Sequence, residues 1–189
     1  MPKARPTKAR TAKAKTKQFP VEHKEKEWTS NRTYKNWVGK LKRAKTIRRS
    51  AKKDLCAGKK GICKNDLGIS RKHMPQFTAR RPINQFRRHI KTEYGINSRA
   101  SKRTADELKP SQGEINREKV DELIDDDLIN NMRVPLVISK DNYIADGHHR
   151  WAAFRMAAPR KPMKVVIIDA PIKDVLGMAV DWGAETQQF

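Results

Sequence analysis

The residues from Asp146 to Arg150, within the sequence YIADGHHRWAAF, combine the side chains best suited to chemistry in this chain. A strand is expected to end at Ala145, and a helix is expected to follow the motif. Asp146 is a good N-cap, because its carboxylate can accept a backbone N–H two or three residues later. Gly147 lets the backbone approach a ligand closely. The first turn of a helix also favours an anion, so the motif predicts a phosphate site.

The side chains of His148, His149 and Arg150 add donors to this helix start, and the planar fork of arginine suits phosphate. A dedicated metal site is not expected, because successive helical residues are splayed by about 100° and cannot easily grip one ion together. A divalent cation could still be bridged by phosphates, with Asp146 or Glu114 as an oxygen ligand. One of the two histidines could instead only cap the helix or pack against its neighbours.

A second polar cluster lies in the sequence KPSQGEIN, from Lys109 to Asn116, just before a predicted helix. It contains Ser111, Gln112 and Glu114. Alone, this cluster also fits an ordinary helix entry, since Ser and Asn are common caps and Glu is favoured in a first turn.

The charge of the 189-residue chain is divided unevenly between its two parts. The chain holds 43 Lys and Arg against 21 Asp and Glu, a net charge of +22. Residues 1–110 hold 33 basic and 8 acidic residues, whereas residues 111–189 hold 10 and 13. Such asymmetry predicts a polyanion-binding part joined to an ordinary folded part. The candidate nucleic-acid-binding residues are Arg43, Lys45, Arg48, Arg49, Arg87 and Arg88.

The basic part divides into a tail with a short tryptophan-containing helix (residues 1–60) and a basic linker with a helix (residues 61–107). The helix is expected from Pro82 to Ile96. Cys56 and Cys63 are expected to be ordinary thiols in a basic loop, because two cysteines make no disulfide framework in a reducing compartment. No apolar run is long enough to cross a bilayer, so a cytoplasmic protein without a membrane partner is expected.

Residues 108–189 predict a small α/β (α+β) domain, in which helices cover a mixed sheet. Residues 117–131 have the apolar spacing of one helix. The sequences VPLVIS and YIA, separated by KDN, indicate a hairpin. A helix after Gly147, a strand MKVVIID and a last helix from Pro171 complete the domain.

The sequences PSQGEIN, VPLVIS and YIADGHHRWAAF resemble the ParB/sulfiredoxin superfamily, in the variant that carries Asp-Gly-His-His-Arg. The resemblance covers roughly Leu108 to Ile172 and implies that the helix-start motif binds nucleotide phosphates. Sulfiredoxins use a cysteine where this chain has His148, so sulfiredoxin chemistry is excluded. Partition proteins of the ParB type carry a Glu-Arg-Arg version, from which His148 and His149 depart.

The motif is most similar to those of the superfamily's free serine kinases and of phage- or plasmid-encoded ParB-like nuclease proteins. This resemblance implies that Glu114 is a base or metal ligand and that Asp146 is a second catalytic carboxylate. It implies that an NTP or ADP-type nucleotide binds, with Mg²⁺ as a candidate companion. The implied phosphate- or nucleotide-binding residues are Ser111, Gln112, Gly147, His148, His149 and Arg150.

Three hypotheses for function remain open. The first is a ParB-like nucleotide-binding enzyme acting on nucleic acid, expected to be DNA, by phosphoryl transfer or nuclease-like hydrolysis. The second is a non-enzymatic DNA-binding protein, associated with a virion or nucleoid, whose ParB-like domain is a scaffold. In the third, the basic arm binds RNA, ribosomes or another protein of a phage capsid, packaging or replication assembly.

Overall fold

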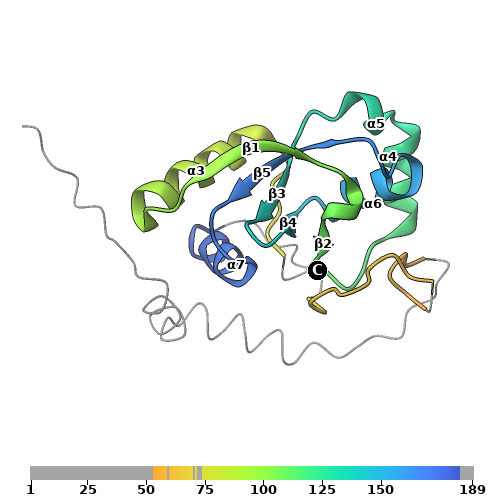
Figure 1. Cartoon of the computed structure of the whole chain (residues 1–189), viewed down its shortest axis with the longest axis horizontal. Helices are drawn as coiled ribbons and strands as arrows, with labels where there is room; N and C mark the ends of the chain where they lie inside the picture. Colours follow the sequence, from red (N-terminus) through yellow and green to blue (C-terminus); the bar gives the residue numbers. More distant parts are fainter. Residues whose placement is uncertain (1–52, 59, 70, 72–73, 184–189) are drawn as a thin grey trace, which may run out of the picture.

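The computed structural model describes residues 53–58, 60–69, 71 and 74–183 (Figure 1). The short tryptophan-containing helix predicted in the basic tail lies outside the described residues, as do Arg43, Lys45, Arg48 and Arg49. The helical elements are α3 (Arg80–Tyr94), η2 (Ala105–Glu107), α4 (Arg117–Asp125), α5 (Leu128–Asn131), α6 (His148–Ala157) and α7 (Ile172–Asp181). The strands are β1 (Ser98–Arg103), β2 (Lys109–Pro110), β3 (Leu136–Ser139), β4 (Tyr143–Asp146) and β5 (Met163–Ile168).

The strands form one five-stranded mixed sheet in the order β1-β5-β3-β4-β2. β1 pairs antiparallel with β5, and β3 pairs antiparallel with β4. β3 pairs parallel with β5, and β2 pairs parallel with β4. The predicted mixed sheet and the predicted hairpin are therefore both confirmed. The hairpin turn contains Asn142 at a φ of 64°, a conformation that asparagine tolerates better than most residues.

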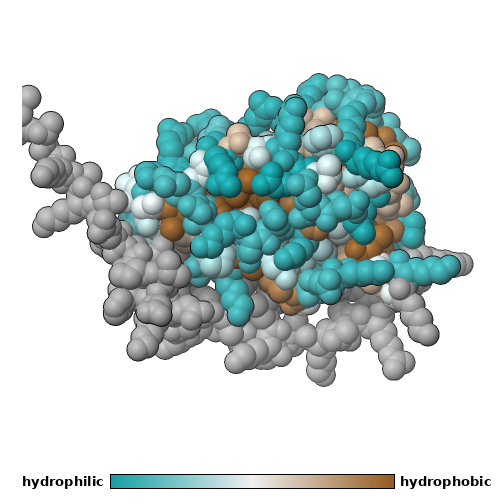
Figure 2. Space-filling model, in the orientation of Figure 1, coloured by the Kyte–Doolittle hydropathy of each residue, from teal (hydrophilic) through white to brown (hydrophobic). Residues whose placement is uncertain are grey.

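Helices cover both faces of the sheet, so that the sheet is the middle one of three layers (Figure 1). On one face, α3 and α7 pack apolar side chains, such as Phe86 and Leu176, against Val137 and Val166. On the other face, α4 and α6 pack Val120, Trp151 and Phe154 against β3 and β5. Hydrophilic side chains cover most of the surface shown in Figure 2, with small hydrophobic areas between them. No helix within the described residues is long and apolar enough to cross a membrane.

Two predicted helices have different outcomes. α3 forms almost where its apolar spacing predicts, because Ile83, Phe86 and Ile90 share a buried side and Gly95 ends the helix at a φ of 66°. The single helix predicted over residues 117–131 is instead two helices, α4 and α5. Asp127 separates them with a φ of 56°, and its carboxylate accepts hydrogen bonds from the side chains of two asparagines in α5.

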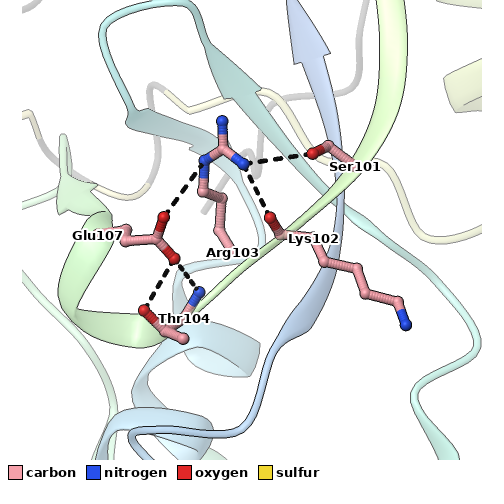
Figure 3. A network of polar contacts seen from close by, with 5 residues as sticks. All are labelled: Ser101, Lys102, Arg103, Thr104 and Glu107. Carbon is pink, nitrogen blue, oxygen red and sulfur yellow. Dashed lines mark hydrogen bonds and ion pairs between the residues drawn. The ribbon is translucent and has the colours of Figure 1, made fainter.

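β1 is a strand that the polar sequence SRASKR does not reveal. It pairs along its whole length with β5, yet it lies ahead of residue 108, the predicted start of the folded domain. β1 is an edge strand, so polar residues can occupy it without being buried. A capping box from Thr104 to Glu107 follows β1: the Thr104 N–H and hydroxyl both donate to the Glu107 carboxylate (Figure 3).

The expectation that Cys56 and Cys63 are thiols is wrong for this structure, because they form a disulfide. A tight turn brings their Cα atoms to 4.8 Å, a separation that a disulfide can span. The turn is part of the fold rather than a linker. The Leu55 N–H donates to the Ile115 carbonyl at 2.9 Å, and the side chains of Leu55 and Cys63 are buried in the core that α4 and α6 cover.

The disulfide should stabilise the folded chain. It closes a ring with a sequence separation of 7, and the loss of chain entropy for a ring of this size stabilises a fold by about 2 to 3 kcal/mol. We expect dithiothreitol to lower the urea midpoint of the wild type accordingly. A double variant, Cys56→Ala/Cys63→Ala, should already unfold at lower urea and should not respond to the reductant. An unchanged wild-type midpoint after complete reduction would contradict this role.

Candidate functional site

The site is built around the junction of β4 and α6. Asp146 is the last residue of β4, and Gly147 is the N-cap of α6 at a φ of 102°. The prediction that Asp146 caps this helix is therefore wrong. A Cβ atom on Gly147 would lie 2.9 Å from the Leu136 side chain and 3.1 Å from the Arg150 guanidinium. Glycine is required here both for its backbone conformation and for space.

Arg150 and Asp146 form a partly buried ion pair, with 2.7 Å between the guanidinium and the carboxylate. The second terminal nitrogen of Arg150 donates to the carbonyls of Val134 and Pro135, at 2.7 and 3.1 Å. Burial raises the pKa of Asp146, and the charge of Arg150 opposes this rise. The guanidinium fork, predicted to grip phosphate, is thus largely engaged by the protein itself.

His148 connects α6 to the segment that follows β2. Its side chain is buried, and its Nε2 accepts the backbone N–H groups of Ser111 and Gln112, each at 3.2 Å. The Ser111 hydroxyl donates to the Ile144 carbonyl at 2.5 Å, so Nε2 of His148 acts purely as an acceptor. The ring is therefore neutral and carries its proton on Nδ1. Burial is the main reason that the pKa of His148 is lowered to about 3.

His149 makes a second connection of the same kind. Its Nε2 accepts the backbone N–H of Asn116 at 3.3 Å. Burial lowers the pKa of His149 to about 4, and the positive charges of Arg71, Lys119 and Arg150 add to this effect. Both histidines are therefore neutral at pH 7, and both use Nε2 to position the backbone of the Lys109–Asn116 segment.

Glu114, predicted as a base or metal ligand, lies in the segment that follows β2. Its Oε1 accepts the backbone N–H of Arg71 at 2.8 Å, and its carbonyl accepts a hydrogen bond from the Gln112 side chain. Neither Glu114 nor the fully buried Ser111 lines the cavity described below. Both residues hold the entry segment in place.

A cavity of about 810 Å³ opens beside the start of α6. Six of the predicted site residues line it: Gln112, Asp146, Gly147, His148, His149 and Arg150. Its charged wall also includes Arg71, Lys119 and Arg133, which were not predicted as site residues, together with the carboxylates Glu122 and Asp126. No motif marks these three cations, because each comes from a different part of the chain and only folding brings them together.

Two of the predicted nucleic-acid-binding residues lie away from the cavity. Arg87 and Arg88, expected to bind nucleic acid, lie on α3 and do not line the cavity. Within the described residues, no group of three or more His, Cys, Asp or Glu side chains could hold a metal ion.

Comparisons with protein-family models, curated proteins and solved structures find no match to this chain. The ParB/sulfiredoxin relationship stays a prediction from the sequence motifs. What the cavity can bind is therefore inferred from its own geometry and charge.

The two histidines should make the fold sensitive to acid. In the unfolded chain they protonate below about pH 6.5, whereas in the folded chain they resist protonation down to about pH 4 and pH 3. The free energy of unfolding should therefore fall as the pH drops below 6.5, by up to about 1.4 kcal/mol per pH unit for each histidine. Urea denaturation from pH 7 to pH 4.5 measures this slope.

The variants His148→Gln and His149→Gln test the assignment, because glutamine keeps an acceptor but does not titrate. Each should flatten the dependence of stability on pH, whatever its stability at pH 7. A slope equal to that of the wild type would show that the histidine in question does not resist protonation.

Proposed function

We propose that this chain is a nucleic-acid-associated protein whose folded part binds a nucleotide in the cavity at the start of α6. The observation that carries the proposal is the cavity itself, which combines a helix N-terminus with the cations Arg71, Lys119 and Arg133. Its volume, about 810 Å³, lies within the usual range for ligand sites. The excess of basic residues in the first 110 positions supports the association with nucleic acid.

The phosphates would bind at the helix start. The first intrahelical bond of α6 runs from the Trp151 N–H to the Gly147 carbonyl, at 2.9 Å. The earlier N–H groups of the turn have no acceptor within the helix and favour an anion. Lys119 and Arg133 are exposed cations on the same cavity wall, free to follow a phosphate chain. The apolar side chains of Leu123 and Val134 could contact the base or sugar.

The geometry supports ligand binding better than catalysis. The carboxylate of Asp146 is paired with Arg150, and the carboxylate of Glu114 accepts a backbone N–H and lies off the cavity wall. A phosphoryl-transfer or nuclease-like reaction would need one of these two carboxylates to act on the ligand, whereas both are engaged by groups of the protein itself. The non-enzymatic alternative, a DNA-binding protein that holds a nucleotide, is therefore favoured over the enzyme.

Nucleotide binding can be measured by thermal shift with ATP, ADP, GTP and CTP, with and without magnesium. At a concentration 100 times its Kd, a nucleotide should stabilise the folded chain by about 2.7 kcal/mol. Lys119→Gln/Arg133→Gln should raise the Kd about tenfold or more, because it removes two charges from the cavity wall. Lys173→Gln, an exposed cation on α7 that does not line the cavity, is the control. No response of the wild type to any nucleotide would refute the proposal.

A turnover assay separates binding from catalysis. We expect the wild-type chain, incubated with magnesium, DNA and the nucleotide that stabilises it, to leave both DNA and nucleotide intact. Hydrolysis or phosphate transfer above the level of a protein-free control would instead favour the enzyme. In that case Glu114→Gln decides the role of Glu114: lost turnover with unchanged binding assigns it as the base, and surviving turnover excludes it.

A further inference from the structure

A basic groove between α3 and the start of β1 is a second surface, separate from the cavity. We infer that this groove binds the sugar–phosphate backbone of a nucleic acid. The inference rests on the nucleic-acid association proposed above and names the folded surface that makes the contact. The groove has a volume of about 560 Å³ and shares no lining residue with the cavity. Its polar lining includes Asn84, Arg87, Arg88, Lys91, Thr92 and Asn97.

The helical period of α3 gathers this lining on one side. Positions 84, 87, 88, 91 and 92 have the spacing i, i+3, i+4, i+7 and i+8, which places them on a single face. The buried side of the helix carries Ile83, Phe86 and Ile90, which pack on the sheet. Because the apolar side is anchored, the basic side is held facing the groove.

Hydrogen bonds to neutral groups hold two of the groove cations in position. Nε of Arg87 donates to the Ser98 hydroxyl at 2.8 Å, and Nζ of Lys91 donates to Oδ1 of Asn97 at 2.7 Å. These partners carry no charge, so they position the cations without neutralising them. Arg88 is exposed beside them. The groove is thus organised before any polyanion arrives.

The surroundings of the groove are strongly basic. Residues 80–103 contain eight Lys and Arg residues and one acid, Glu93. Among the described residues, Arg103 is the one of these eight that forms an ion pair with a carboxylate, that of Glu107 at 3.8 Å. Figure 3 shows this pair, and it shows the Lys102 side chain pointing away from it. The remaining positive charge is available to a ligand.

The charged and polar side chains of the lining favour a sugar–phosphate backbone over a base. Arginine and lysine, together with amide and hydroxyl side chains, are the groups that contact phosphates and sugars in nucleic-acid complexes. No aromatic side chain lines the groove, so it has no platform on which a base could stack. Binding should therefore be independent of base sequence and strongly dependent on salt.

The test compares two full-length triple variants that lose the same charge. Arg87→Gln/Arg88→Gln/Lys91→Gln removes the groove cations and leaves side chains that can still donate hydrogen bonds. Lys140→Gln/Arg160→Gln/Lys173→Gln is the matched control, because these exposed cations lie outside both the groove and the cavity. Affinity for a random-sequence DNA duplex is measured by fluorescence anisotropy over a series of salt concentrations.

The groove variant should bind DNA at least tenfold more weakly near physiological salt. The slope of log K against log salt should become shallower by about 2 to 3, since each lost phosphate contact contributes about 0.9. The control variant should change affinity less than threefold, because it loses only long-range attraction. Both variants should keep the thermal midpoint of the wild type.

Three outcomes would overturn the inference. Equal slopes in the two triple variants would mean that the groove makes no specific phosphate contact. Competition by polyglutamate as effective as that by DNA would indicate an acidic protein partner instead. A wild-type chain that does not bind DNA would remove the nucleic-acid part of the proposed function as well. The nucleotide thermal shift, measured on the same variants, reports separately on the cavity and should be unchanged in the groove variant.

Discussion

The acceptor nitrogen of His148 is the constraint on which the site depends. One buried ring atom accepts two successive backbone N–H groups, those of Ser111 and Gln112, and so fixes the segment after β2 against the first turn of α6. A protonated ring could not accept either bond, because both nitrogens of an imidazolium are donors. Burial keeps the ring neutral, and the neutral ring in turn satisfies two N–H groups that would be costly to leave unpaired.

The rest of the junction follows from this arrangement. β4 must turn sharply into α6 so that His148 points towards Ser111, and Gly147 provides that turn with a positive φ. Arg150, one turn further along the helix, then reaches back to Asp146 and to the carbonyls that precede β3. Removing either partner of this pair would leave a buried charge without compensation. The Asp-Gly-His-His-Arg motif therefore joins β3, β4, α6 and the entry segment, and the anion site is proposed at its backbone N–H groups.

Those parts of the fold that follow from a local pattern of apolar residues could be predicted from the sequence. The spacing of Ile83, Phe86 and Ile90 predicts α3, and the apolar runs on either side of Asn142 predict the β3–β4 hairpin. β1 was missed because an edge strand needs no alternating apolar pattern, and its partner β5 lies about 65 residues further along the chain.

The sequence indicated several residues that lie at the cavity, but not the contacts that their side chains make. The structure places Gly147, His148, His149 and Arg150 on the wall of one cavity. What their side chains do depends on partners distant in the sequence: Ser111 lies 37 residues before His148, and Val134 lies 16 before Arg150. Whether a histidine grips a ligand or a backbone N–H is decided by such long-range contacts, which local spacing cannot reveal.

The distribution of charge bears on the proposal that one small domain binds two kinds of anion at two different places. Residues 80–103, around the groove, have a net charge of +7, whereas residues 117–131, which form α4 and α5 beside the cavity, have a net charge of −4. A long polyanion is repelled by the acidic helices and attracted to α3 and β1, and screening over about 10 Å keeps the two effects local. For a small phosphate ligand inside the cavity, attraction would outweigh the repulsion by the acidic helices. Its charge would lie close to the cations and to the N-terminus of α6, where the attraction is least screened. On the proposed assignments, net charge would direct nucleic acid to the groove, and short-range geometry would direct a nucleotide to the cavity.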